Sequence, residues 1–408
     1  MKETRPRIGF VSLMEGGAWG GSEALWAAAS GAALAAGHAV AISSRRWPSD
    51  PAPILDLEAR GARVFRRKRA PKGIRRAFGA PFRAFAAFRP DVVCVNQGQT
   101  YDAIRSRKFA ALTTWLERSR VPYVVLCHGN TGAPRSDAER QRARAFFATA
   151  QHISFPARRM LELAEQQLLT SLANAVVLQN PVNLDDLDPL PWPEALTPEF
   201  GLISRLEWLK GIDVVLEALC TDVWAQREWR LRIAGDGPDR AYYEQLAAHL
   251  GLGDRVRFLG HRPDVREIWS ACHLGLLASR SEGLPLAVVE AMVCGRPVVM
   301  SDVGAVRELV VEERHGFIAE APTPLSFARA LERAWAARAR WPEMGCAARE
   351  RALASLTPPP GEVLLELLRE AAAHLTRDAV PRGAGGGTLV GLRPERHRSV
   401  GSPGGPGA

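Results

Sequence analysis

Two cations in the second half of the chain could hold a diphosphate. Arg205 and Lys210 follow a predicted strand at 200–204, and in open α/β sheets ligands bind beyond the carboxyl ends of the strands. An arginine offers a planar fork of donors and a lysine a mobile point charge, so together they can neutralise a diphosphate leaving group without a metal ion. The alternative is a pair of solvated surface charges, and these two residues alone do not decide between the interpretations.

Two carboxylates, Glu282 and Glu290, lie eight positions apart around a predicted helix start. Pro285 suits the first helical position, where its missing N–H is not needed. The free N–H groups of the first turn, near Leu286 and Ala287, would attract a phosphate. Carboxylates suit sugar and ribose hydroxyls because they accept from two vicinal donors at once. The alternative is an ordinary acidic helix start followed by one glutamate on a buried face.

The elements that must position these residues alternate between strands and helices in both halves of the chain. Their apolar, β-branched strands are typical of parallel sheets buried on both faces. In the first half, strands are predicted at 7–13, 39–43, 91–95 and 122–127, and helices at 22–36, 101–118 and 137–149. In the second half, strands are predicted at 200–204, 230–234, 255–259, 273–277 and 297–300, and helices at 211–219, 240–250, 285–293 and 325–337. The sequence therefore predicts an α/β fold with two Rossmann-like, doubly wound domains.

A proline-rich run separates the two alternating sets. We expect a first domain at 1–180, a linker at 181–198 and a second domain at 199–360, followed by a helix at 361–376. The tail at 377–408 is dominated by Gly, Pro and Arg and has too few large apolar groups to offset its ordering entropy, so it is predicted to be disordered.

Several motifs occur together in an order that resembles a known family. They are the run SRLEWLKG at 204–211, the run EGLPLAVVEAMVCGRPVV at 282–299, AGDGP at 234–238, VRFLG at 256–260, HGFI at 315–318, GGSE at 20–23 and AGHAV at 36–40. This pattern is similar to that of retaining glycosyltransferases of family 4, the group 1 transferases with the GT-B fold, in which two such domains face across a cleft. The resemblance covers about residues 7–375 and is loosest between 44 and 180.

The resemblance implies a role for each charged residue of the second domain. Arg205 and Lys210 match the pair that grips the donor diphosphate. Glu290 matches the glutamate that holds the ribose hydroxyls, and Glu282 matches the one that faces the donor sugar. The helix at 361–376 is then expected to cross back to the first domain.

The resemblance also implies a contribution from the first domain. Gly20 and Gly21 match the loop that closes over the phosphates, and His128, at a predicted strand end, matches a position near the transferred sugar. A single histidine in such a place is otherwise more often structural. Where many members have Gly-Phe-Gly, this chain has Gly283-Leu284-Pro285, so one candidate phosphate donor is absent and the identity of the sugar stays open.

The implied activity is transfer of a sugar from a nucleoside-diphosphate sugar to an acceptor hydroxyl with retention of anomeric configuration. Expected acceptors are saccharides or lipid-linked saccharides in the synthesis of a cell-surface polysaccharide, glycolipid or other glycoconjugate. No enzyme nucleophile is evident, and the donor phosphate could serve as the base. The alternative is a non-catalytic nucleotide-sugar-binding or regulatory protein of the same fold.

No cofactor or metal ion is expected. Asp186 and Asp188 form a DxD pattern, but it lies in the proline-rich linker and not after a strand of a sheet. The glycine turns at 16–21 and 235–237 do not continue into the GxGxxG pattern of dinucleotide-binding proteins, so NAD binding is not expected either.

Bulk properties bear on location and partners. The N-terminus has no apolar signal core, no run is long enough to span a membrane, and the six cysteines form no CxxC pair, so a cytoplasmic protein with reduced thiols is predicted. The net charge is +9. The acid-free segment at 66–88 mixes cations with Phe78, Phe82, Phe85 and Phe88, which could hold the chain on the inner face of an anionic membrane. The alternatives are ordinary packing of the aromatics or, less in keeping with the motifs, single-stranded nucleic acid; no nucleic-acid partner is expected.

Overall fold

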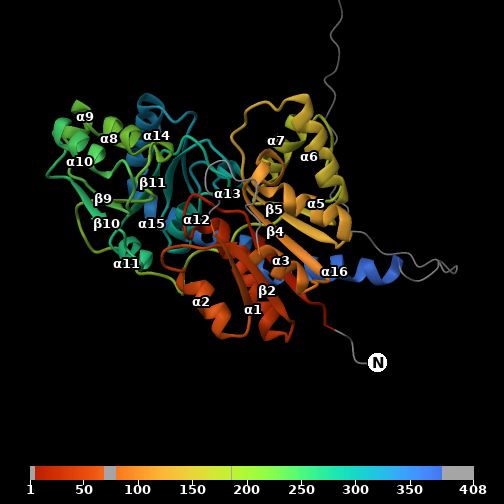
Figure 1. The fold of residues 1–408 in the computed structure, drawn as a ribbon. Coiled ribbons are helices and arrows are strands. Elements are labelled where there is room, and N and C mark those ends of the chain that lie inside the picture. Colours follow the sequence, from red (N-terminus) through yellow and green to blue (C-terminus); the bar gives the residue numbers. More distant parts are fainter. Residues whose placement is uncertain (1–4, 69–79, 185, 379–408) are drawn as a thin grey trace, which may run out of the picture.

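The chain folds around two separate parallel sheets, which lie side by side in Figure 1. The structure is a computed structural model that describes residues 5–68, 80–184 and 186–378. The first sheet has the order β3-β2-β1-β4-β5-β6-β7 and the second the order β10-β9-β8-β11-β12-β13. In both sheets the chain reverses direction across the sheet after its third strand, so that the first and fourth strands are neighbours, as in two Rossmann-like units.

The strands of the first sheet are β1 (Ile8–Ser12), β2 (Val40–Arg45), β3 (Arg63–Arg67), β4 (Val92–Gln99), β5 (Tyr123–Gly129), β6 (His152–Phe155) and β7 (Ala175–Val177). Those of the second sheet are β8 (Glu199–Ile203), β9 (Arg230–Ala234), β10 (Val256–Gly260), β11 (Leu274–Leu277), β12 (Val298–Ser301) and β13 (Gly316–Ala319). β1, β11, β12 and β13 are buried along their whole length, because helices cover both faces of each sheet.

The larger helices of the first domain are α1 (Gly21–Ala35), α2 (Ala52–Ala59), α3 (Ala80–Ala87), α5 (Ala110–Ser119), α6 (Asp137–Thr149) and α7 (Arg158–Leu168). The second domain has α8 (Ile212–Leu219), α10 (Arg240–His249), α11 (Val265–Ser270), α12 (Leu286–Val293), α13 (Val306–Leu309), α14 (Pro324–Ala336) and α15 (Trp341–Ser355). The α/β fold with two Rossmann-like domains is therefore confirmed.

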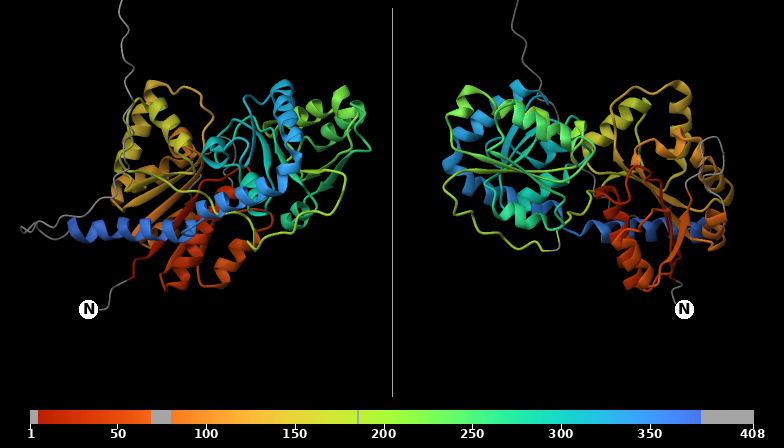
Figure 2. Two further views of the ribbon diagram at one scale, coloured as in Figure 1. Left: turned by 180° about the vertical axis from the view of Figure 1, so that it is seen from behind. Right: turned by 60° about the vertical axis from the view of Figure 1, so that its left-hand side comes forward.

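The last described helix, α16 (Pro360–Asp378), lies along the first domain. In Figure 2 it is the long blue helix that leaves the second domain and runs past the sheet of the first. Leu364, Leu368 and Ala371 are completely buried, and α16 packs against α1, β4 and β5. The chain thus passes between the domains twice, once through 178–198 and once into α16. Of the tail predicted at 377–408, residues 377–378 belong to α16 and the remainder lies outside the described residues.

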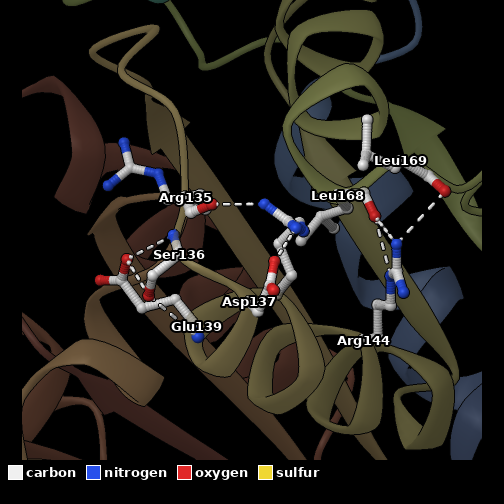
Figure 3. A network of polar contacts seen from close by, with 8 residues as sticks. Arg135, Ser136, Asp137, Glu139, Arg144, Leu168 and Leu169 are labelled. Atoms are coloured by element: carbon white, nitrogen blue, oxygen red, sulfur yellow. Dashed lines mark hydrogen bonds and ion pairs between the residues drawn. The ribbon is translucent and has the colours of Figure 1, made fainter.

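The α6–α7 pair shows how the ends of helices are satisfied by tertiary contacts (Figure 3). α6 begins with a capping box, in which the Ser136 hydroxyl accepts from the N–H of Glu139 and the Glu139 carboxylate accepts from the N–H of Ser136. Arg144 on α6 donates to the carbonyl of Leu168, with Nε to O 2.8 Å, at the carboxyl end of α7. A cation at this end satisfies carbonyls that have no partner inside the helix.

The basic segment of the sequence contributes a strand that the apolar pattern did not reveal. Arg66 and Arg67 end β3, and Phe82 and Phe85 lie on α3 with their rings buried in the core of the first domain. Arg67 is itself buried and donates to the backbone oxygens of Ser12 and Ser43. Phe78 lies outside the described residues.

Candidate functional site

The carboxyl edges of the two sheets meet at two close contacts. Gly283 lies so near the end of β5 that a Cβ at this position would overlap the carbonyl oxygen of His128. A Cβ on Gly21, the first residue of α1, would likewise overlap the side chain of Leu286 at the start of α12. Glycine is required at Gly283 because the overlapping atom is a backbone oxygen, whereas at Gly21 the overlapping atom is the end of the Leu286 side chain, which can rotate. These contacts bring His128 and Gly21 of the first domain next to Gly283 and Leu286 of the second.

On the second domain, Lys210 and Glu282 form an ion pair. The Lys210 Nζ lies 2.7 Å from Glu282 Oε1, and both side chains are largely buried. The Ser279 hydroxyl donates to the same oxygen at 2.7 Å. Arg205 is exposed on the loop after β8, where its Nε lies 3.4 Å from Glu207. The ammonium can donate three hydrogen bonds, so Lys210 can bind a ligand while it keeps Glu282.

The loop that carries Lys210 is held by a second ion pair beneath it. Arg280 donates to both carboxylate oxygens of Asp213, at 3.0 and 2.6 Å, and its guanidinium lies 4.5 Å from the ring centroid of Trp208. Gly211 follows with φ at 64°, a left-handed conformation that favours glycine. The Arg280–Asp213 ion pair and the left-handed backbone of Gly211 therefore both restrict the conformation of the turn after β8.

Glu290 lies in the second turn of α12 and is buried. Burial raises its pKa to about 7, and a hydrogen bond from the backbone N–H of Asn183 offsets this only in part. The helix begins one residue later than predicted, with Pro285 at the N-cap and not in the first turn. Its first internal bonds are donated by Val288 and Val289 to the carbonyl of Pro285, so the N–H groups of Leu286 and Ala287 stay at the helix start as the sequence predicts.

On the first domain, His128 ends a chain of buried polar contacts. Its Nε2 lies 2.6 Å from Asn96 Oδ1, the Asn96 amide donates to Glu23 at 2.9 Å, and Glu23 accepts from Ser12 at 2.6 Å. Burial lowers the pKa of His128 to about 4, so its imidazole is neutral at neutral pH and donates to Asn96. Burial also raises the pKa of Glu23, which its hydrogen bonds counteract.

Sequence reasoning assigned no role to Asn96 or Glu23. Glu23 was part of the GGSE motif, and Asn96 directly follows the predicted strand at 91–95. The rule that ligands gather at the carboxyl ends of strands could have singled out Asn96. Gly20, in contrast, is the N-cap of α1, and a side chain there would meet nothing within 4 Å.

The DxD pattern has a local role in the linker. Asp186 pairs with Arg266 at 2.9 Å and accepts from the N–H of Asp188 at 2.7 Å. Within residues 5–68, 80–184 and 186–378, no cluster of three or more His, Cys, Asp or Glu could hold a metal ion. In the same part of the chain, no helix has the length and apolar character needed to cross a bilayer.

Fold and site together define a two-domain α/β protein in which charged and polar residues lie where the carboxyl edges of two Rossmann-like sheets meet. The family profile described as Glycosyl transferases group 1 matches residues 197–337, and the one described as Glycosyltransferase Family 4 matches residues 19–186. The chain belongs to this family of group 1, family 4 glycosyltransferases and has its GT-B fold.

Individual relatives match over limited lengths. The human phosphatidylinositol N-acetylglucosaminyltransferase has a subunit that is 32% identical over 39% of this chain, and N-acetyl-alpha-D-glucosaminyl L-malate synthase of Bacillus anthracis is 33% identical over 29%. The matches span 33% and 31% of those proteins' own lengths.

Solved structures match over nearly the whole chain. HepE of Anabaena in complex with UDP-glucose has a TM-score of 0.68 at 20% identity, over 91% of this chain and 99% of that one. Sucrose-phosphate synthase of Thermosynechococcus elongatus has a TM-score of 0.70 at 20% identity, over 90% and 100%. At this identity the likeness is one of fold.

Proposed function

We propose that the protein is a retaining glycosyltransferase that moves a sugar from a nucleoside-diphosphate sugar to an acceptor hydroxyl. The observation that carries the proposal is the juxtaposition of the Lys210–Glu282 pair and the start of α12 with the end of β5 on the other domain. The non-catalytic alternative is less favoured, because every charged residue that the resemblance assigns to catalysis is present in the chain, and Lys210 and Glu282 lie beside this junction.

In the proposed mechanism the difficult step is loss of the diphosphate as negative charge moves onto it. Arg205, Lys210 and the first N–H groups of α12 stabilise that charge, and Lys210 is already held in place before the reaction by its ion pair with Glu282. Glu290 accepts from the ribose hydroxyls and Glu282 from the donor sugar. His128, being neutral, orients the sugar by hydrogen bonding and does not deliver a proton. The phosphate itself takes the proton of the acceptor hydroxyl.

The closing of the two domains excludes water and aligns the acceptor. Gly20 and Gly21, at the amino end of α1, cover the phosphates from the first domain, and Gly283 permits the close approach of the second domain. We expect no metal ion to take part. The proposed acceptors are saccharides or lipid-linked saccharides, in the synthesis of a polysaccharide, glycolipid or other glycoconjugate.

The test is binding and turnover with a panel of donors. Calorimetry with UDP, GDP, ADP and CDP identifies the base, and a transfer assay with the corresponding sugars identifies the donor. Removing Lys210 or Arg205 deletes a contact to the leaving group, and loss of one such contact slows chemistry by ~100- to 1000-fold. Lys210→Ala and Arg205→Ala are therefore compared with Arg257→Ala, an exposed cation on β10. Near-wild-type turnover in both site variants would refute the assignment, and nucleotide binding without hydrolysis or transfer of any sugar would favour the non-catalytic alternative.

Peripheral contact of 66–88 with an anionic membrane is a separate proposal, and fewer residues of the segment support it than the sequence predicts. Phe82 and Phe85 are buried, and Arg66 already pairs with Asp50 and Glu58. Among the described residues of the segment, the exposed cations are Lys68 and Arg83. Co-sedimentation with anionic vesicles, compared between wild type and the Lys68→Gln, Arg83→Gln double variant, tests what they contribute.

A further inference from the structure

The first domain has a hollow that the donor residues do not explain. It lies beyond the carboxyl end of β2, in the connection to α2, and has a volume of about 430 Å³. Pockets for small ligands have volumes of roughly 300–1000 Å³, so a sugar residue fits. The hollow is lined by Arg46, Trp47, Pro48, Asp50 and Arg66.

The hollow adjoins the catalytic edge of the sheet. A neighbouring, smaller hollow shares Trp47 and Asp50 with it and extends to Ser12 and Glu23. Glu23 is joined through Asn96 to His128. A ligand in the larger hollow is therefore on the first domain, next to the polar chain that leads to the position of the transferred sugar.

An aromatic ring forms part of its wall. Trp47 is partly exposed, and the guanidinium of Arg45 covers one face of its ring, 4.2 Å from the centroid, so that a ligand would pack on the other face. The face of an indole ring is electron-rich, so it attracts the polarised C–H groups on the apolar face of a pyranose. A tryptophan in a polar hollow is thus suited to a saccharide more than to a small inorganic ion.

One cation that lines the hollow is left for an anionic ligand. Arg66 is occupied by ion pairs with Asp50 and Glu58, with Nε to Asp50 at 2.5 Å, whereas Arg46 is exposed. Within the part of the chain that the structure describes, Arg45 and Arg46 pair with no carboxylate. The Nε of Arg45 is buried and has no hydrogen-bond partner. Arg46 therefore stands in the wall of the hollow beside Trp47 without a counter-ion, and a negatively charged sugar would complete this arrangement.

We propose that this hollow is an acceptor subsite for an anionic sugar, a uronate or a sugar phosphate, whose ring packs on Trp47 and whose negative group binds Arg46. The inference rests on the proposed glycosyltransferase function and adds the chemical class of the acceptor. In both cases the ligand is a pyranose that carries a negative charge, and the charged group is either a carboxylate or a phosphate.

The experiment uses the full chain labelled with 5-fluorotryptophan, in which the Trp47 resonance is assigned from its loss in Trp47→Phe. Glucose, glucuronate, glucose 6-phosphate and inorganic phosphate are titrated at low salt. We expect both anionic sugars, or one of them, to shift the Trp47 signal at concentrations about ten-fold lower than glucose, since a charge-assisted hydrogen bond strengthens binding by about that factor. Arg46→Gln should abolish that advantage, and the control Arg257→Gln should keep it.

The outcomes separate the subsite from the donor site, because UDP, GDP, ADP and CDP binding is measured by calorimetry on the same samples. A response to glucuronate alone identifies a carboxylate, and a response to glucose 6-phosphate alone identifies a phosphate. Equal affinity for glucose and the anionic sugars, no shift with any sugar, an unchanged response in Arg46→Gln, or phosphate binding as tightly as the sugars would each overturn the proposal. If the sugar titrations fail but the wild-type protein binds a nucleoside diphosphate, the acceptor subsite is refuted and the proposed glycosyltransferase function stands. If the wild-type protein binds none of the four nucleotides, the proposed function is refuted independently of the subsite.

Discussion

Glu290 is a carboxylate whose ionisation in the folded protein is costly. Its pKa is raised to about 7 from the ordinary value of 4.5, so the folded state holds a proton that the unfolded state releases between these pH values. Stability contributed by this group is therefore present at low pH and lost as the pH rises to about 7. Above that pH, the raised pKa of Glu290 lowers the free energy of unfolding by roughly 3 kcal/mol.

Replacing Glu290 with Gln should separate stability from binding. Without nucleotide, Glu290→Gln is expected to be more stable than wild type at pH 8 by up to ~3 kcal/mol and nearly equal to it at pH 5. The same variant should bind the nucleoside diphosphate more weakly, because an amide accepts from only one of two vicinal hydroxyls. Denaturant unfolding at both pH values and calorimetry measure the two effects. The exposed Glu350→Gln on α15 is the control, and a site variant less stable than wild type at pH 8 would contradict the assigned pKa.

Among the elements, α7 depends on the other domain for its amino end. Its N-cap residue, Ala157, has no side chain that can cap, and Glu308 on α13 accepts from the N–H groups of Arg158 and Arg159, each at 2.9 Å. A carboxylate at a helix start satisfies free donors and favours the positive end of the dipole. At the carboxyl end of α7, Arg144 donates a hydrogen bond to the free carbonyl of Leu168. The first N–H groups of α7 are therefore capped only when the two domains are in contact.

We predict that Glu308 favours the closed arrangement. Loss of an N-capping side chain costs ~0.5–2 kcal/mol, so Glu308→Ala should lower kcat/KM for the donor by up to ~30-fold and enlarge the radius of gyration of the nucleotide-free protein. Small-angle scattering and steady-state kinetics check this. Glu320→Gln, an exposed glutamate of the same domain, should change neither quantity. An unchanged radius of gyration in Glu308→Ala would show that other contacts hold the domains.

At the scale of the whole molecule, the proposed mechanism requires that the carboxyl edges of both sheets come together. A methyl group on Gly283 would overlap the carbonyl of His128. Gly283→Ala should therefore hold the domains apart and lower transfer by at least ~10-fold, with nucleotide binding to the second domain largely kept. Gly253→Ala is a matched control, because a Cβ there meets nothing within 4 Å. If Gly283→Ala transfers sugar at the wild-type rate, this contact does not form in the closed enzyme.

The charges that the molecule brings to the diphosphate also predict how it responds to metal removal. In the proposed mechanism, Arg205, Lys210 and the start of α12 supply the positive potential that a divalent ion would otherwise supply. We expect transfer to persist after exhaustive chelation with EDTA and to change little when magnesium or manganese is added back. Complete loss of activity that either ion restores would show that a metal takes part and that Asp186 and Asp188 must be reconsidered.

Much of the fold was predictable because it depends on local patterns. Buried parallel strands are continuous apolar runs, so β1, β4, β5 and β8 were found within a few residues. β3 was not, because its sequence RVFRR carries three arginines. Arg67 can lie inside the protein only because backbone oxygens of Ser12 and Ser43 accept its hydrogen bonds, and those partners are distant in sequence.

The sequence by itself determined the alternation of strands and helices and the residue types at the ends of the strands, because period, turn residues and motif spacing are local properties. Only the tertiary structure decided which of these residues meet. The contact of Gly283 with His128, the chain from Ser12 to His128 and the capping of α7 by Glu308 join segments that are far apart along the chain. The burial that raises the pKa of Glu290 and lowers that of His128 exists only once the core around them has formed.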